Sequence, residues 1–192
     1  MPGPFPCSFP IRITLFLLVA DWAGTGSRLS LEPDVNREYL RKDLLSFFIP
    51  WTLTMFAAGA LCVWEVAGGE IVFTPVTVLG LFLFVIGMVP VFVAHVTLRR
   101  WYSSFLAIRD GHQLIRHGIY RYLRHPIYTG TISALLGLPL VISSVYGFAT
   151  MLLIIPLFLN RIRMEEKMLI GEFGADYLAY METTRRLIPF VY

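Results

Sequence analysis

The chain is poor in charge and in cysteine. Only 15% of its 192 residues are charged, whereas a soluble domain usually carries about 25%. Its two cysteines, Cys7 and Cys62, have neither the spacing of a metal site nor that of a disulfide framework. The glycines form no phosphate loop or dinucleotide fingerprint, and no serine or cysteine nucleophile motif occurs. These absences argue against a soluble nucleotide-binding enzyme, a zinc protein and a disulfide-stabilised domain.

Long apolar segments are what the chain has instead. Hydrophobic residues make up 56% of it, and its mean hydropathy is +0.66. A run of about 20 apolar residues, rising 1.5 Å each, crosses roughly 30 Å of hydrocarbon as a helix. We therefore predict an all-α integral membrane protein. Its apolar regions are Ile11–Ala23, Leu44–Val66, Pro75–Leu98 and Thr129–Leu159.

The last apolar region is too long for one span. Gly137-Leu138-Pro139 interrupts it near the middle, and Ser143-Ser144 interrupts it again. We predict a tight helical hairpin over residues 129–160, with a second arm that continues toward Gly171. Together with the short first region this gives about five transmembrane helices. A cleaved signal peptide is the alternative interpretation of that first region.

Basic residues alternate between the predicted loops. Residues 25–43 and 99–124 are rich in arginine, whereas residues 67–74 contain no Lys or Arg. Because basic loops stay in the cytoplasm, we expect an outside N-terminus and a cytoplasmic C-terminus and active site. We predict a single membrane domain, 1–192, with three spans in 1–98 and the catalytic half in 99–192. The net charge of +3 is too mild to imply a nucleic-acid partner.

Polar side chains are concentrated on both sides of the predicted hairpin. Residues 112–130 hold three histidines, three arginines and three tyrosines, and residues 160–180 hold further charges. Polar groups beside a bilayer are costly and therefore suggest a site. The hairpin brings its two ends to one membrane face, so we expect Arg124, His125 and Tyr128 to lie near a second group. That group is Arg161, Arg163, Glu165 and Glu166.

Two smaller patterns occur at these positions. Arg161 and Glu165 lie four residues apart and share a helix face, which fits either a surface ion pair or a pair of ligand contacts. The histidines at 112, 117 and 125 match no zinc template, and Pro126 breaks the local helix beside them. We therefore expect no metal site.

The two polar segments resemble a known signature. Gly118-Ile119-Tyr120-Arg121, followed by Arg124-His125-Pro126-Ile127-Tyr128-Thr129-Gly130, is similar to that of the isoprenylcysteine carboxyl methyltransferase family. The resemblance covers about 80 residues, from Gly111 to the C-terminus. With about 190 residues and five predicted spans, the chain looks like the compact prokaryotic members of that family. The downstream positions that match are Arg161, Glu165-Glu166, Phe173-Gly174, Tyr177, Tyr180 and Arg185 to Pro189.

The resemblance implies a function and a set of site residues. The expected cofactor is S-adenosyl-L-methionine, bound without a Rossmann domain and released as S-adenosyl-L-homocysteine. The expected reaction transfers its methyl group to the carboxylate of a lipophilic, isoprenylcysteine-like acceptor that enters from the membrane lipids. Arg161 is implied to be catalytic, on the acceptor side. The implied cofactor contacts are His112, Gln113, Leu114, Ile115, Tyr120, His125, Pro126, Ile127, Tyr128 and Glu165.

Other functions remain compatible with parts of this pattern. The C-terminal signature is also similar to that of phospholipid N-methyltransferases, whose amine acceptor would suit a carboxylate better than Arg161. It is similar as well to the NADPH-dependent sterol C14-reductases, which have about twice as many spans. A non-enzymatic membrane scaffold would not need two polar motifs that meet at one face.

Overall fold

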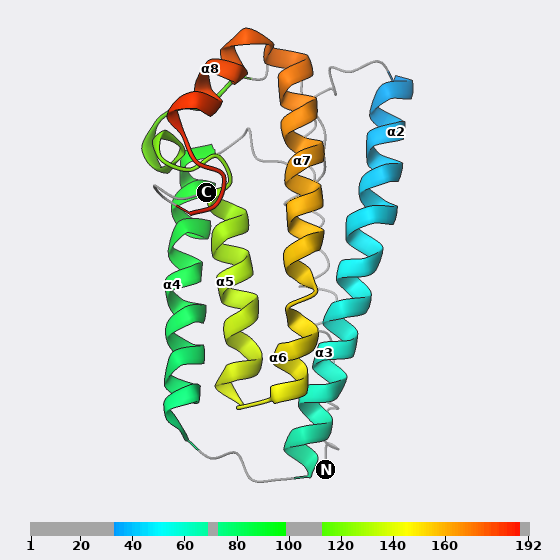
Figure 1. The fold of residues 1–192 in the computed structure, drawn as a ribbon, viewed down its shortest axis with the longest axis vertical. Coiled ribbons are helices and arrows are strands. Elements are labelled where there is room, and N and C mark those ends of the chain that lie inside the picture. Colours follow the sequence, from blue (N-terminus) through cyan, green and yellow to red (C-terminus); the bar gives the residue numbers. More distant parts are fainter. Residues whose placement is uncertain (1–32, 69–72, 99–112, 189–192) are drawn as a thin grey trace, which may run out of the picture.

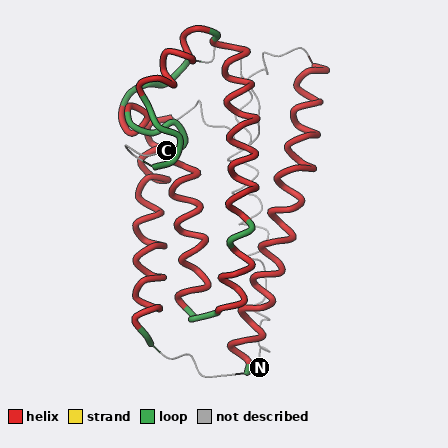
Figure 2. Tube along the Cα trace, viewed as in Figure 1, coloured by secondary structure: helices red, strands yellow, loops and turns green. Residues whose placement is uncertain are grey.

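The computed structural model describes residues 33–68, 73–98 and 113–188. Within these ranges the chain is helical, as Figure 2 shows, and its single β feature is an isolated parallel bridge. The predicted first span, Ile11–Ala23, lies outside the described residues. The long helices run roughly parallel or antiparallel in one bundle (Figure 1).

The first helical stretch among the described residues is continuous and begins before Leu44, the predicted start of this apolar region. Helix α2 (Pro33–Asp43) leads into a π-helical turn, η1 (Leu44–Phe48), and then into α3 (Ile49–Ala67). Pro50, in the first turn of α3, cannot donate a backbone hydrogen bond and crowds the carbonyl four residues before it. A widened turn before the proline relieves that conflict, which accounts for the position of η1.

Helices α4 and α5 form the closest pair in the bundle. Helix α4 (Pro75–Leu98) has the bounds predicted from the sequence, and α5 spans Pro126–Val141. A Cβ on Gly87 would lie 2.6 Å from the Gly130 carbonyl oxygen, and one on Gly137 would lie 2.5 Å from that of Gly80. Small residues let two backbones approach within a membrane, where packing rather than hydrophobicity drives helix association. The last glycine of the signature, Gly130, therefore serves helix packing.

Adding a side chain at Gly130 should separate these two helices. We expect Gly130→Val to lower the free energy of unfolding by about 3 kcal/mol, because the added atoms meet backbone and the ring of Pro90. Gly59→Val is the matched control, since a Cβ there has nothing within 4 Å. Thermal unfolding in detergent measures both variants, and equal midpoints would contradict the packing role.

The predicted hairpin is present. Of the two interruptions predicted for it, only the one at Ser143-Ser144 is a turn. Gly137 and Pro139 lie inside α5, so the prediction of a break there was wrong. The chain instead turns at Ser143, which adopts a positive φ of 55°. Ser144 then caps α6 (Val145–Met151) by accepting a hydrogen bond from the Gly147 amide at 2.9 Å. Helix α7 (Ile154–Phe173) follows and passes Gly171, as predicted.

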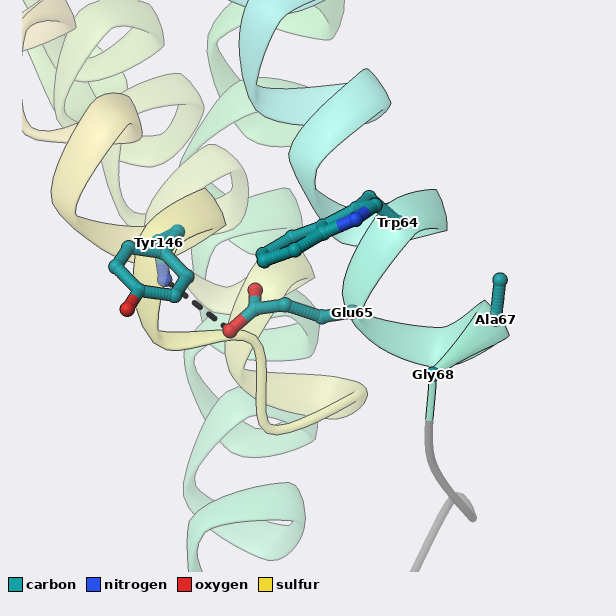
Figure 3. A pocket seen from close by; sticks show the side chains of 5 residues that line it. All are labelled: Trp64, Glu65, Ala67, Gly68 and Tyr146. Atoms are coloured by element: carbon teal, nitrogen blue, oxygen red, sulfur yellow. Dashed lines mark hydrogen bonds between the residues drawn. The ribbon is translucent and has the colours of Figure 1, made fainter.

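A carboxylate fixes this turn against the end of α3. Glu65 accepts hydrogen bonds from the Ser144 hydroxyl and from the backbone amide of Val145, the latter at 3.2 Å. Glu65 lines a hollow of about 550 Å³ together with Trp64 and Tyr146. Figure 3 shows the Glu65 side chain beside Trp64 and directed toward Tyr146. Aromatic side chains of this kind are typical of the membrane interface. Glu65 is therefore a helix cap at the end of the bundle opposite the polar segments.

Among the described residues, three helices are long and apolar enough to cross a membrane. They comprise Glu38–Ala67, Pro75–Leu98 and Val145–Phe173, and α5 is a shorter apolar helix beside them. Large side chains on α4 point outward, with Phe82 57% and Phe92 69% exposed. Such an apolar exterior would aggregate in water but suits lipid. The described chain is thus an all-α membrane protein.

Candidate active site

The two polar segments meet at one end of the bundle, drawn at the top of Figure 1. The loop before α5 contains a short 3-10 helix, η3 (Gly118–Arg121), and α8 (Ala175–Thr183) turns back over this end after α7. Gly118 and Gly174 both have positive φ, at 62° and 52°, which glycine adopts without strain. These two turns let the loop and α8 fold toward each other, and the predicted convergence is confirmed.

Glu166 is the centre of a buried charge cluster. Its Oε1 accepts a hydrogen bond from Arg124 Nε at 2.9 Å, and its Oε2 accepts one from Arg186 Nε at 2.9 Å. His125 Nε2 lies 3.4 Å from Oε1. The Glu166 side chain is only 4% exposed. Two arginines on one carboxylate join the signature loop, α7 and the C-terminal segment in a single network.

The segment after α8 pairs with the signature loop along its backbone. Leu123 and Arg185 form a parallel bridge, and the Arg124 amide donates to the Arg185 carbonyl at 2.7 Å. Arg124 Nη1 also donates to the carbonyl of Thr184 at 2.6 Å. The Thr129 hydroxyl donates to the Leu187 carbonyl at 2.7 Å. Arg124 therefore ties the C-terminal segment to the start of α5.

Glu165, the neighbour of Glu166, faces a different group of residues. The Tyr128 hydroxyl donates to Glu165 Oε2 at 2.7 Å, and His125 Nδ1 lies 3.8 Å from the same oxygen. The rings of His125 and Tyr128 stack at 5.5 Å with an interplanar angle of 11°. The Glu165 side chain is 27% exposed. A carboxylate accepts several hydrogen bonds, so Glu165 can serve a ligand as well as Tyr128.

Arg161 lies one helical turn before Glu165 and is buried. Its Nη2 lies 3.2 Å from Asp43 Oδ2, and its guanidinium carbon lies 4.3 Å from the ring centre of Phe47 and 4.8 Å from that of Phe48. The Tyr128 ring lies further away, at 5.9 Å. Because the Arg161 side chain is enclosed rather than on the surface, the surface-pair interpretation of its spacing from Glu165 was wrong.

Two tyrosines of α8, Tyr177 and Tyr180, are buried at this end of the bundle. The Tyr180 hydroxyl donates to the Tyr120 carbonyl at 2.6 Å. Burial raises the pKa of Tyr180 to about 12, and burial followed by the charge of Glu166 raises the pKa of Tyr177. Both hydroxyls are therefore neutral at physiological pH.

The remaining predicted residues are distributed along the loop. Gln113 is exposed, whereas Leu114 and Ile115 are half-buried in an extended stretch that leads into η3. Pro126 is buried at the first position of α5, where a proline suits a helix start, and Ile127 follows it. Within the described part of the chain, no hydrogen bond joins residues 113–115 to the other predicted residues. His112 lies outside the described residues.

The site combines a partly exposed carboxylate, aromatic faces and a buried guanidinium. Such a set can bind an organic cation through Glu165 and the Tyr128 ring, and a carboxylate through Arg161. No group of three His, Cys, Asp or Glu side chains that could hold a metal ion occurs among the residues described. The arrangement therefore suits two organic ligands of opposite charge.

Comparisons with known proteins find related sequences and a related fold. The model of the isoprenylcysteine carboxyl methyltransferase (ICMT) family matches residues 78–171, which include Tyr128, Arg161 and Glu165. Protein-S-isoprenylcysteine O-methyltransferase A of Arabidopsis thaliana is 31% identical over 115 residues, and the Saccharomyces cerevisiae enzyme is 30% identical over 118. A solved structure of the eukaryotic intramembrane Ras methyltransferase ICMT superposes with a TM-score of 0.63 at 25% identity. Residues 78–171 of this chain therefore match the ICMT family.

The match to these relatives covers only part of each protein. The aligned region covers 58% of this chain and 58% of the Arabidopsis protein, and 60% of this chain and 49% of the yeast protein. The structural superposition covers 73% of this chain and 52% of the solved one. The chain thus spans about half to three fifths of the length of these relatives.

Asp43 of the site network was not predicted from the sequence, and Arg186 was noted only within the matched run Arg185 to Pro189, without a role. Asp43 and Arg186 both lie outside residues 78–171, the part matched by the family. Asp43 is the last charge before an apolar run, a position typical of a loop end. Its complete burial is the feature that distinguishes it from its neighbours, and burial becomes visible only in the fold.

Proposed function

We propose that this protein is an S-adenosylmethionine-dependent methyltransferase that esterifies the carboxylate of a lipophilic, isoprenylcysteine-like acceptor. The observation that carries the proposal is the placement of Arg161 and Glu165 on either side of Tyr128. The Tyr128 hydroxyl binds Glu165, and its ring faces the Arg161 guanidinium. One tyrosine thereby links a site for a cation to a site for an anion at the end of a membrane bundle.

The residues on the Glu165 side fit the cofactor. S-adenosylmethionine supplies a methyl group on a positively charged sulfur, together with a cationic amino group. Glu165 is a partly exposed carboxylate for the amino group, and the stacked His125 and Tyr128 rings offer faces to a cation. Residues 112–115, Tyr120, Pro126 and Ile127 would complete this side. The match of residues 78–171 to the ICMT family supports the assignment.

The residues on the Arg161 side fit the acceptor. A carboxylate is ionised at neutral pH, so the reaction needs no general base. The protein has to orient the acceptor and remove water around it, effects that together supply several kcal/mol. Arg161 would hold the carboxylate in a fixed direction, and its 6% exposed side chain places that contact away from solvent. An apolar tail would remain among the membrane helices.

The arrangement in the membrane follows the same proposal. Five spans would place the N-terminus outside and the site end of the bundle in the cytoplasm, where the basic loops lie. Three spans would belong to residues 1–98, and residues 99–192 would form the catalytic half. A cytoplasmic site end lets a polar cofactor arrive from water while the acceptor arrives from lipid.

The reaction can be tested with labelled cofactor. Purified protein in liposomes is incubated with tritiated S-adenosylmethionine and an N-acetylated S-farnesylcysteine. We expect label that base releases from the acceptor, as a methyl ester requires. Base-stable label in phosphatidylethanolamine would instead identify an amine methylase. Binding of NADPH but not of S-adenosylhomocysteine would contradict methyl transfer.

Removing the charge of Glu165 should weaken cofactor binding. We expect Glu165→Gln to raise the Kd for S-adenosylhomocysteine about tenfold or more, because a hydrogen bond to a charged group is worth about 1.5–3 kcal/mol. The amide can still accept the Tyr128 hydroxyl, so the local fold is kept. Glu172→Gln, an exposed change on the same helix, is the control. Calorimetry measures both, and equal affinities in Glu165→Gln and wild type would remove Glu165 from this role.

A further inference from the structure

A carboxylate from the first half of the bundle is buried against Arg161. Asp43 is fully buried at the end of α2, and its Oδ2 lies 3.2 Å from Arg161 Nη2. The two residues are 118 positions apart in the sequence. A buried ion pair gives little net stability, because removing two charges from water offsets most of their attraction. Apolar side chains would hold η1 to α7 at least as well, so stability alone does not explain the pair.

The π-helical turn shapes the surroundings of this pair. In a regular α-helix, positions 43 and 47 share a face, whereas position 48 lies about 140° away from 43. The wider turn of η1 instead brings Phe48 as well as Phe47 over the guanidinium. Asp43, Phe47 and Phe48 therefore fix Arg161 from one side, and Tyr128 faces it from another. Such π-turns occur frequently at functional sites.

We propose that Asp43 is a positioning residue for methyl transfer. It orients the Arg161 side chain and weakens the attraction of Arg161 for the acceptor carboxylate. This inference rests on the proposed function, in which Arg161 binds that carboxylate. The N–H groups on the two edges of a guanidinium can each bind a carboxylate. Arg161 can therefore bind Asp43 and an acceptor carboxylate at the same time.

The charge of Asp43 matters because of the direction of the reaction. The acceptor carboxylate loses negative charge as its oxygen forms the bond to the methyl carbon. An arginine without a second anion would stabilise the fully charged acceptor more than the transition state, and that difference slows turnover. Asp43 offsets part of the arginine charge and so reduces the excess attraction to the ground state.

The test separates positioning from a purely structural role. Affinities are measured for an N-acetylated S-farnesylcysteine and for its carboxamide, with S-adenosylhomocysteine bound so that no methyl transfer occurs. In Asp43→Asn we expect the preference for acid over amide to rise about fivefold and kcat to fall about tenfold, while the Kd for S-adenosylhomocysteine stays within about twofold. Glu38→Gln removes a charge from the same helix at an exposed position and should change none of these.

Each other outcome has a defined meaning. An unchanged acid preference or an unchanged kcat in Asp43→Asn overturns the proposal. If Asp43→Asn does not bind S-adenosylhomocysteine, Asp43→Glu decides, since it keeps the charge but moves it by one methylene. If Asp43→Glu keeps the wild-type preference for acid over amide but has a lower kcat, the positioning role is supported. If Asp43→Glu has the wild-type kcat, or also fails to bind S-adenosylhomocysteine, the proposal is overturned. Failure of the wild-type protein to form ester would count against the proposed function instead.

Discussion

An Arg161→Lys variant is expected to lose about 100-fold in turnover of a prenylcysteine acceptor while its Kd for S-adenosylhomocysteine stays within about threefold. Lysine keeps the positive charge but not the planar fork that can hold two carboxylates in fixed directions. It also loses the stacking on Phe47 and Phe48. Alanine would be a poorer choice, because it would leave the buried Asp43 carboxylate without its partner charge.

Arg163→Lys is the matched control for this variant. Arg163 lies on the same helix two residues later, but its side chain is exposed. The measurement is initial-rate formation of base-labile methyl ester, together with calorimetric binding of S-adenosylhomocysteine. Equal loss of turnover in the two variants, or loss of cofactor affinity in Arg161→Lys, would show that Arg161 does not act on the acceptor side.

Neutralising Glu166 should disrupt the C-terminal segment. In Glu166→Gln, Arg124 and Arg186 lose the carboxylate between them, and Arg124 stays buried with an 8% exposed side chain. Breaking a buried pair in this way costs about 3–5 kcal/mol, which lowers the Tm by roughly 10 °C in a chain of this size.

Two measurements check this result. Thermal unfolding in detergent reports the stability, and limited proteolysis after the basic residues 185 and 186 reports release of the segment from the signature loop. Glu182→Gln, an exposed change on α8, should leave both unchanged. A Glu166→Gln protein that is as stable and as resistant to cleavage as Glu182→Gln would show that the cluster does not hold this segment.

The parts of the fold set by local composition were predictable from the sequence. The bounds of α4 follow from an uninterrupted apolar run, and the convergence at the site follows from the hairpin. The position of the turn was harder to predict, because glycine and proline interrupt a pattern without always ending a helix. In α5, Gly137 packs on the α4 backbone and Pro139 lies close to the helix end.

Other features depend on contacts between distant residues. Glu165 and Glu166 are identical neighbours in the sequence, yet one faces Tyr128 and the other is enclosed by two arginines. Only the rotation of α7 relative to α5 distinguishes them. The pairing of Asp43 with Arg161 likewise joins the two halves of the chain, and no local pattern specifies such a partner.

The close contact of α4 and α5 also restricts how a lipid could reach the site. Where Gly87 meets Gly130 and Gly80 meets Gly137, the two backbones touch and leave no room even for a methyl group. A prenyl chain is wider than a methyl group, so it cannot pass between α4 and α5 at these contacts. We therefore expect the hydrocarbon tail of the proposed acceptor to reach the site by a route other than the contact between α4 and α5.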